Sequence, residues 1–247
     1  MKNFFKAAIF LALFLMTMPS KAQLSICYDN DGFTNVRKSA SINSKVIGKI
    51  TEGQVFAIAS YTQEEENKSP DWVAINFPLA VQKYAGDLLK FSGKEQLGYI
   101  HKSRLVRLEQ LPSLDLMKSD ANTVTHDDGY FAVTIETGAF RPTDHQVIQQ
   151  KTGTYLIDGK RAFAYYGAET HEIKRITLKS KTGKYIVPAQ TFKNLFGVSA
   201  VYTTVYRGEK EEYYIVFDAG DGADAYNIVY CWKDNRLFSM TVTSTIP

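Results

Sequence analysis

The chain has 247 residues, of which 29 are basic and 26 acidic, so its formal net charge at pH 7 is only +3. Because the charges are balanced and no long basic run occurs, the sequence gives no electrostatic basis for binding nucleic acid or an anionic membrane. The length exceeds that of one small domain and suits two domains, each able to bury its own core.

The N-terminal residues have the pattern of a secretory signal peptide. Lys2 and Lys6 precede an apolar run, Ala7–Met18, and small residues follow at Ser20 and Ala22. A membrane-spanning helix needs about 20 uninterrupted apolar residues, and this run is shorter. We therefore predict cleavage after Ala22, a periplasmic or secreted protein, and no membrane insertion after cleavage. Loss of residues 1–22 removes three basic residues and no acidic one, which leaves 26 of each.

The chain has two cysteines, Cys27 and Cys231. Cys27 lies shortly after the apolar run, where the lipidated cysteine of a lipoprotein would lie. Lipidated cysteines follow a small residue, however, and Ile26 is bulky, so a lipoprotein is disfavoured. In an exported protein the two cysteines either form a disulfide that joins the two ends of the chain or remain buried thiols. Both alternatives stay open from the sequence.

Residues 24–108 alternate short β-branched and aromatic runs with turn residues, a spacing typical of a small β-barrel. We predict strands at Thr34–Arg37, Val46–Ile50, Val55–Ser60, Trp72–Phe77 and Tyr99–His101. One segment breaks the pattern. The apolar residues Val81, Tyr84, Leu88 and Leu89 have a helical period, which predicts a short helix over Ala80–Phe91.

Three motifs in this region occur in the order found in bacterial SH3 (SH3b) domains. They are GFTNVRKSASINSKVIGKITEGQVF at 32–56, DWVAINF at 71–77 and GYIHKSRL at 98–105. Residues 26–108 thus resemble an SH3b domain, which implies a barrel of five or six strands that binds cell-wall peptides or protein segments. The connection at 78–97 is longer than in the family, so a ligand groove beside it could be reshaped or covered.

The ligand-binding candidates are aromatic and polar residues of the three motifs and of the preceding strand. An exposed aromatic shelf offers apolar area to an extended peptide, and flanking polar groups orient it. The candidates are Tyr28, Phe33, Asn35, Trp72, Tyr99 and His101. Each also has a structural interpretation, because Trp72 suits a barrel core, Asn35 a loop, and His101 a hydrogen-bonded strand position.

Residues 109–127 contain turn formers and little periodicity, so we predict a linker there and a second, β-rich (α+β) domain at 128–247. Including the first 22 residues as signal peptide, this leaves 23–108 for the SH3-like domain. Pro188–Phe196 is predicted as one short helix. The predicted strands are Tyr130–Ile135, Thr154–Ile157, Ile173–Leu178, Tyr185–Val187, Ser199–Val205, Tyr213–Phe217, Ala225–Trp232 and Leu237–Val242. The segments at 156–167, 172–196 and 218–232 are loosely similar to C-terminal domains of uncharacterised bacterial secreted proteins, which imply no activity.

Patterns that carry chemistry are missing from the sequence. No histidine follows Cys231, as a Cys-His peptidase would require, and HExxH, GxSxG and phosphate-loop motifs are absent. The acids Asp218, Asp221 and Asp224 lie three residues apart, which is the wrong spacing for an EF-hand, so a hairpin connection is favoured. The mature chain's histidines, which form no zinc motif, are His101, His126, His145 and His171. We therefore predict no catalytic residue, metal or cofactor.

The sequence favours an exported, non-catalytic binding protein whose SH3-like domain recognises a peptidoglycan peptide or an envelope protein segment. Two alternatives remain. One is a cell-wall hydrolase with an unfamiliar catalytic domain at 128–247, and the other is an immunity protein that binds a toxin.

Overall fold

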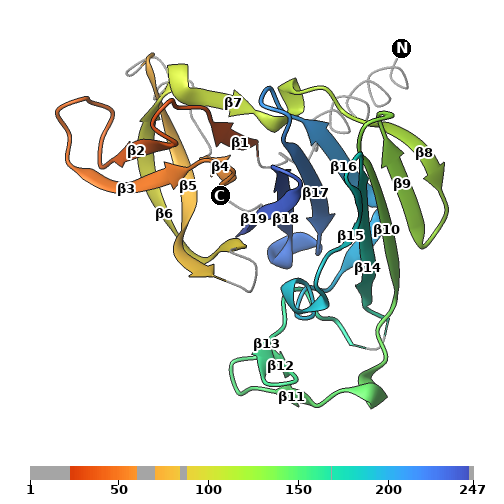
Figure 1. The fold of residues 1–247 in the computed structure, drawn as a ribbon. Coiled ribbons are helices and arrows are strands. Elements are labelled where there is room, and N and C mark those ends of the chain that lie inside the picture. The colour runs from red at the N-terminus through yellow and green to blue at the C-terminus, as the bar shows by residue number, and fades with distance from the viewer. Residues whose placement is uncertain (1–22, 60–69, 84–87, 168, 245–247) are drawn as a thin grey trace, which may run out of the picture.

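The computed structural model describes residues 23–59, 70–83, 88–167 and 169–244 (Figure 1). The predicted signal peptide, residues 1–22, lies outside these ranges. Within them the chain is mainly β-structure, as the sequence predicts, and its helices are 3-10 turns of three residues. None of these helices has the length and apolar character needed to cross a membrane.

The strands of the first part of the chain are short except for two. They are β1 (Leu24–Cys27), β2 (Phe33–Arg37), β3 (Val46–Thr51), β4 (Phe56–Ile58), β5 (Trp72–Lys83), β6 (Leu89–His101) and β7 (Leu105–Arg107), with 3-10 turns η1 (Lys102–Arg104) and η2 (Leu108–Gln110). The predicted helix over Ala80–Phe91 is wrong, because β5 and β6 occupy its two ends. A short apolar run fits either period, and here eleven residue pairs between β5 and β6 favour the strand.

The second part contains both short and long strands. They are β8 (Asp115–Ser119), β9 (Thr123–Asp127), β10 (Ala132–Ala139), β11 (Val147–Gln149), β12 (Tyr155–Ile157), β13 (Lys160–Arg161), β14 (His171–Ser180), β15 (Gly183–Ile186), β16 (Val198–Arg207), β17 (Tyr213–Ala219), β18 (Tyr226–Lys233) and β19 (Arg236–Ser244). Three 3-10 turns lie between them, η3 (Pro142–Asp144), η4 (Ala189–Thr191) and η5 (Gly222–Asp224). Of the helix predicted at Pro188–Phe196, only η4 forms. The stretch expected as a linker, 109–127, contains β8 and β9.

One curled sheet of 11 strands runs through both parts of the chain. Its order is β16-β17-β18-β19-β6-β5-β4-β1-β7, and β2 joins it through β6 and carries β3. The two parts meet where β19 lies parallel to β6, with Ser239 opposite Leu89 and Thr241 opposite Phe91. The sheet is therefore continuous across the position where the sequence suggests a domain boundary.

Two smaller sheets complete the fold. The order of the five-stranded sheet is β15-β14-β10-β9-β8, and the three-stranded sheet contains β11, β12 and β13. The five-stranded sheet packs on one face of β16–β19 through a large core that includes Val133, Ile176, Ile215, Phe217 and Ile228 (Figure 1). The three-stranded sheet extends from one end of this pair of sheets.

The opposite face of β17 and β18 packs against the N-terminal strands. We call this cluster the shared core, because both parts of the chain supply it. Its buried members are Ile26, Val55, Leu108, Leu111, Tyr214, Val216, Val229 and Cys231. Alternation along the strands explains the two cores: on β17, Ile215 and Phe217 face the five-stranded sheet while Tyr214 and Val216 face β1 and η2. A further cluster inside the curl of β1–β7 contains Val36, Ile50, Phe56, Ile75 and Ile100.

Candidate functional site

Five of the six residues chosen from the sequence lie on one face of β2, β5 and β6. Antiparallel pairing places Tyr99 opposite Arg37 and His101 opposite Trp72, and directly opposed side chains point to the same side of a sheet. Phe33 and Asn35 share this side because they alternate with buried Thr34 and Val36 along β2. We call this surface the aromatic face. Its members are Phe33, Asn35, Arg37, Trp72, Tyr99 and His101.

The aromatic face is positioned by the small core behind it. Val36, Val73, Ile75 and Ile100 point to the opposite side of the same strands and are buried there. Gly98 lets β6 approach β2 closely, since a Cβ at this position would lie 2.3 Å from Val36 Cγ1. The next residue, Tyr99, is therefore held against β2 with its side chain outward.

Contacts on the aromatic face fix several side chains. The rings of Trp72 and His101 meet edge to face, with centroids 5.5 Å apart at 85°. His101 Nδ1 lies 2.8 Å from Ser103 Oγ. At the other end, Lys49 Nζ lies 3.6 Å from the centre of the Phe33 ring, and Arg37 donates a hydrogen bond of 2.8 Å to the Ser44 carbonyl. The face thus combines apolar rings with cations and hydrogen-bonding groups.

Tyr28, the sixth candidate, lies elsewhere, at the contact between the two parts of the chain. Its hydroxyl donates to the carboxylate of buried Glu212 and accepts a 3.0 Å hydrogen bond from the Glu209 backbone N–H. Burial first, and then the bond to Glu212, raise the pKa of Tyr28. Lys210 Nζ lies 5.3 Å from the centre of the Tyr28 ring. These contacts give Tyr28 a structural role.

Both cysteines are free, buried thiols. Cys27 packs in the curl of β1–β7, and Cys231 belongs to the shared core. Burial raises the pKa of Cys27 to about 12. The pKa of Cys231 is also raised, first by burial and then by the negative charge of Glu212. A cysteine nucleophile acts as the thiolate, so neither environment suits covalent catalysis.

The histidines and acids that could serve a metal or a reaction are dispersed. His145 Nδ1 lies 2.7 Å from Asp158 Oδ2, whereas His126 is buried between β9 and β16. The acids between β17 and β18 form a hairpin connection, as predicted, in which Asp221 Oδ1 accepts the Gly222 N–H at 2.7 Å. No group of three or more His, Cys, Asp or Glu side chains able to hold a metal occurs in the described ranges.

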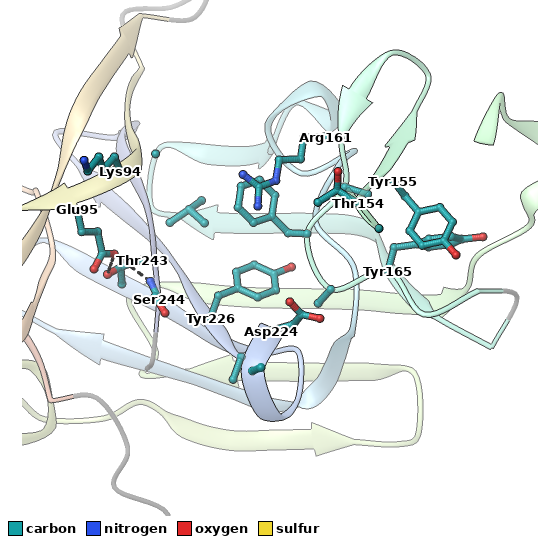
Figure 2. Close-up of a pocket in the computed structure, with 18 residues that line it drawn as sticks. Lys94, Glu95, Thr154, Tyr155, Arg161, Tyr165, Asp224, Tyr226, Thr243 and Ser244 are labelled. Carbon is teal, nitrogen blue, oxygen red and sulfur yellow. Dashed lines mark hydrogen bonds between the residues drawn. The ribbon is translucent and has the colours of Figure 1, made fainter. Parts of the chain in front are cut away.

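The structure also contains a groove that the sequence did not predict (Figure 2). Its volume is about 600 Å³, and it lies between β6, the β12–β13 hairpin with the loop after it, η5 and the end of β19. Its floor and walls are aromatic: Tyr155 and Tyr165 meet edge to face at 5.0 Å, and Phe163 lies 5.7 Å from Tyr226. Because four distant segments supply the groove, no local motif marks it. The pattern of aromatic residues at 155, 163 and 165 is the one signal available.

Comparison of the chain with known protein families, curated proteins and solved structures found no match. The site must therefore be interpreted from its own geometry.

Proposed function

We propose that this chain is an exported binding protein. Its N-terminal part is an SH3-like barrel that binds a peptidoglycan peptide or an envelope protein segment on the aromatic face. The observation that carries this proposal is the convergence of five sequence-selected residues, from three different strands, on that one face.

The chemistry of the aromatic face suits an extended peptide. Tyr99, Trp72 and Phe33 supply flat apolar area at low cost in side-chain entropy. Asn35 and His101 are exposed polar side chains that can orient a peptide backbone. Arg37 and Lys49 add positive charge beside the rings, which favours a ligand with carboxylate groups, as wall peptides have.

Co-sedimentation of residues 23–247 with insoluble peptidoglycan tests the proposal. We expect the wild-type chain to sediment and Tyr99→Ser to reduce the bound fraction by about tenfold, because a buried aromatic contact at an interface contributes roughly 1–3 kcal/mol. Tyr202→Ser is the matched control, since Tyr202 is 66% exposed on β16. Equal loss of binding in both variants would contradict the proposal. A wild-type chain that neither sediments with peptidoglycan nor forms a complex with an envelope protein would also contradict it.

The test uses the whole mature chain for a structural reason. Residues 23–108 supply Ile26, Val55 and Leu108 to the shared core, and β6 pairs with β19. An isolated N-terminal fragment would expose this apolar surface, so its failure to bind would say nothing about the aromatic face. Zymography of the same chain on wall substrate checks the hydrolase alternative, and clearing that is lost in His145→Ala or His171→Ala would favour that alternative.

A further inference from the structure

The groove described above has an unusual backbone feature on one side. β19 and β6 pair for three residues, and their pairing ends at Thr241 and Phe91. Beyond this point both strands continue along the groove, with Gly93–Glu95 on β6 and Val242–Ser244 on β19. Each remains paired on its outer side, β6 with β5 and β19 with β18. Past Thr241 and Phe91 the two strands are joined by the Glu95 side chain of β6, which reaches the edge of β19.

The contacts of Glu95 show that the edge of β19 presents hydrogen-bond donors and binds an acceptor group. Its carboxylate receives hydrogen bonds from the Thr243 hydroxyl and from the Ser244 backbone N–H, the latter at 2.9 Å (Figure 2). A side-chain carboxylate thus satisfies a strand-edge donor at this position. A peptide strand satisfies such donors with its carbonyl groups, as in β-strand addition.

Two cations and two acids line the groove, and two further lysines lie beside it. Lys94 and Arg161 line it, and Lys160 adjoins Arg161. Lys90, on β6, is close enough to Lys160 for that charge to lower the pKa of Lys90 further, after burial. The negative groups are Asp224 and Glu95, and Glu95 is already bonded to β19.

Arg161 is the cation best placed to meet a ligand. Its guanidinium carbon lies 5.8 Å from the centre of the Phe163 ring, and Figure 2 shows the Arg161 side chain among the residues that line the groove. Within the described ranges neither Arg161 nor Lys94 forms an ion pair. A guanidinium stacked on an aromatic ring keeps its planar fork of donors available, and this fork matches a carboxylate.

We propose that the groove is a second binding site, which takes an extended acidic peptide segment of a partner protein. The segment lies along the edge of β19, where its carbonyl groups take the place of the Glu95 carboxylate. Its apolar side chains contact Phe163, Tyr155 and Tyr165, and a carboxylate side chain pairs with Arg161. With the aromatic face farther along β6, at Tyr99 and His101, the protein then has two peptide-binding surfaces and can join two partners.

A selection from a random dodecapeptide phage library on immobilised residues 23–247 tests this site. We expect enriched peptides that carry Asp or Glu beside apolar or aromatic residues. Synthetic copies should bind about tenfold more weakly to Arg161→Ala, because a charge-assisted hydrogen bond is lost. Arg175→Ala is the matched control, since Arg175 is exposed on β14 outside the groove, and its binding should equal that of the wild type.

The outcomes separate this site from the aromatic face. Peptides that lose binding in Tyr99→Ser but not in Arg161→Ala would belong to the aromatic face and would overturn the groove proposal. Enrichment of no peptide, or of peptides without acids, would also overturn it. Binding of a carboxylated polysaccharide such as alginate, weakened in Arg161→Ala while no peptide binds, would assign the groove to a glycan instead.

Discussion

Strands β17 and β18 differ from β2 and β6 in how their two faces are used. Nearly every residue of β17 and β18 is buried, because the five-stranded sheet covers one face and the N-terminal strands cover the other. Along β2, by contrast, buried and accessible residues alternate. A strand covered on both faces can only be scaffold, whereas a strand covered on one face leaves a surface for a ligand. The comparison therefore supports the proposal that a ligand binds on β2, β5 and β6, with β17 and β18 as the scaffold.

The largest expected effect concerns the scaffold strands. Phe217→Ala removes a fully buried ring from β17 and should lower the free energy of unfolding by about 3–5 kcal/mol. Because the sheet and the shared core are continuous, the N-terminal part should lose the same stability. Trp232→Phe leaves Trp72 as the single tryptophan, so urea unfolding followed by its fluorescence reports on β5.

The contrast between scaffold strands and ligand-binding strands assumes one cooperative unit, so two unfolding transitions in the Trp232→Phe variant would contradict it. We expect the fluorescence of Trp72 and the far-UV circular dichroism to change at one urea concentration, with and without Phe217→Ala. Tyr202→Ala, on an exposed position of β16, should change stability by less than about 0.5 kcal/mol. A Trp72 transition that does not move with Phe217→Ala would mean that the two parts fold independently.

The contact between the two parts should show a smaller effect. Tyr28→Phe removes the hydroxyl that donates a hydrogen bond to the buried carboxylate of Glu212. This carboxylate retains its hydrogen bonds from the Tyr214 hydroxyl, at 3.4 Å, and from the Lys210 backbone N–H, at 2.8 Å. We expect a loss of about 1–3 kcal/mol in urea unfolding, since a buried charged acceptor loses a donor. Peptidoglycan binding should stay unchanged. Tyr130→Phe, at an exposed residue, is the control, and a binding defect specific to Tyr28→Phe would return Tyr28 to the ligand site.

Buried His126 should make the scaffold sensitive to acid. Burial lowers its pKa below the ordinary value of 6.5, and contacts with the backbone at Leu114 and Thr203 oppose this only in part. Below pH 6.5 the unfolded chain therefore binds a proton that the folded chain excludes. The contribution of neutral His126 to the free energy of unfolding is present above pH 6.5 and is lost as the pH falls toward the folded-state pKa. His126→Leu should flatten the pH dependence of urea unfolding in that window, whereas His171→Leu, at an exposed residue, should not. An unchanged slope in His126→Leu would contradict this assignment.

The smallest effect concerns the thiols. With pKa values raised by burial, Cys27 and Cys231 should react with a thiol reagent at pH 8 only after denaturation. Denaturation without reductant should then release two thiols per chain. A count of zero would show instead that the two residues form the disulfide that the sequence left open.

Local signals in the sequence predict much of the fold but not its assembly. The strands around Val36, Trp72 and Tyr99 follow from β-branched and aromatic residues between turns, and the predicted ligand residues there share a face because period-two alternation determines side. The parallel pairing of β19 with β6 joins residues about 150 positions apart and has no local signature. The groove, with Glu95, Arg161 and Tyr226 from separate segments, was missed for the same reason. The strand identity of residues 80–83 was missed because a short apolar run fits either period, and it rests on the pairing of β5 with β6.

The most direct test of the account is hydrogen–deuterium exchange of residues 23–247, with and without soluble peptidoglycan fragments. We expect slower exchange at 33–37 and 97–101, where the aromatic face lies, and no change at 213–219 and 226–232, where β17 and β18 are already buried on both faces. Protection confined to 153–165 and 223–226, which line the groove, or protection nowhere, would contradict the assignment of wall binding to the aromatic face.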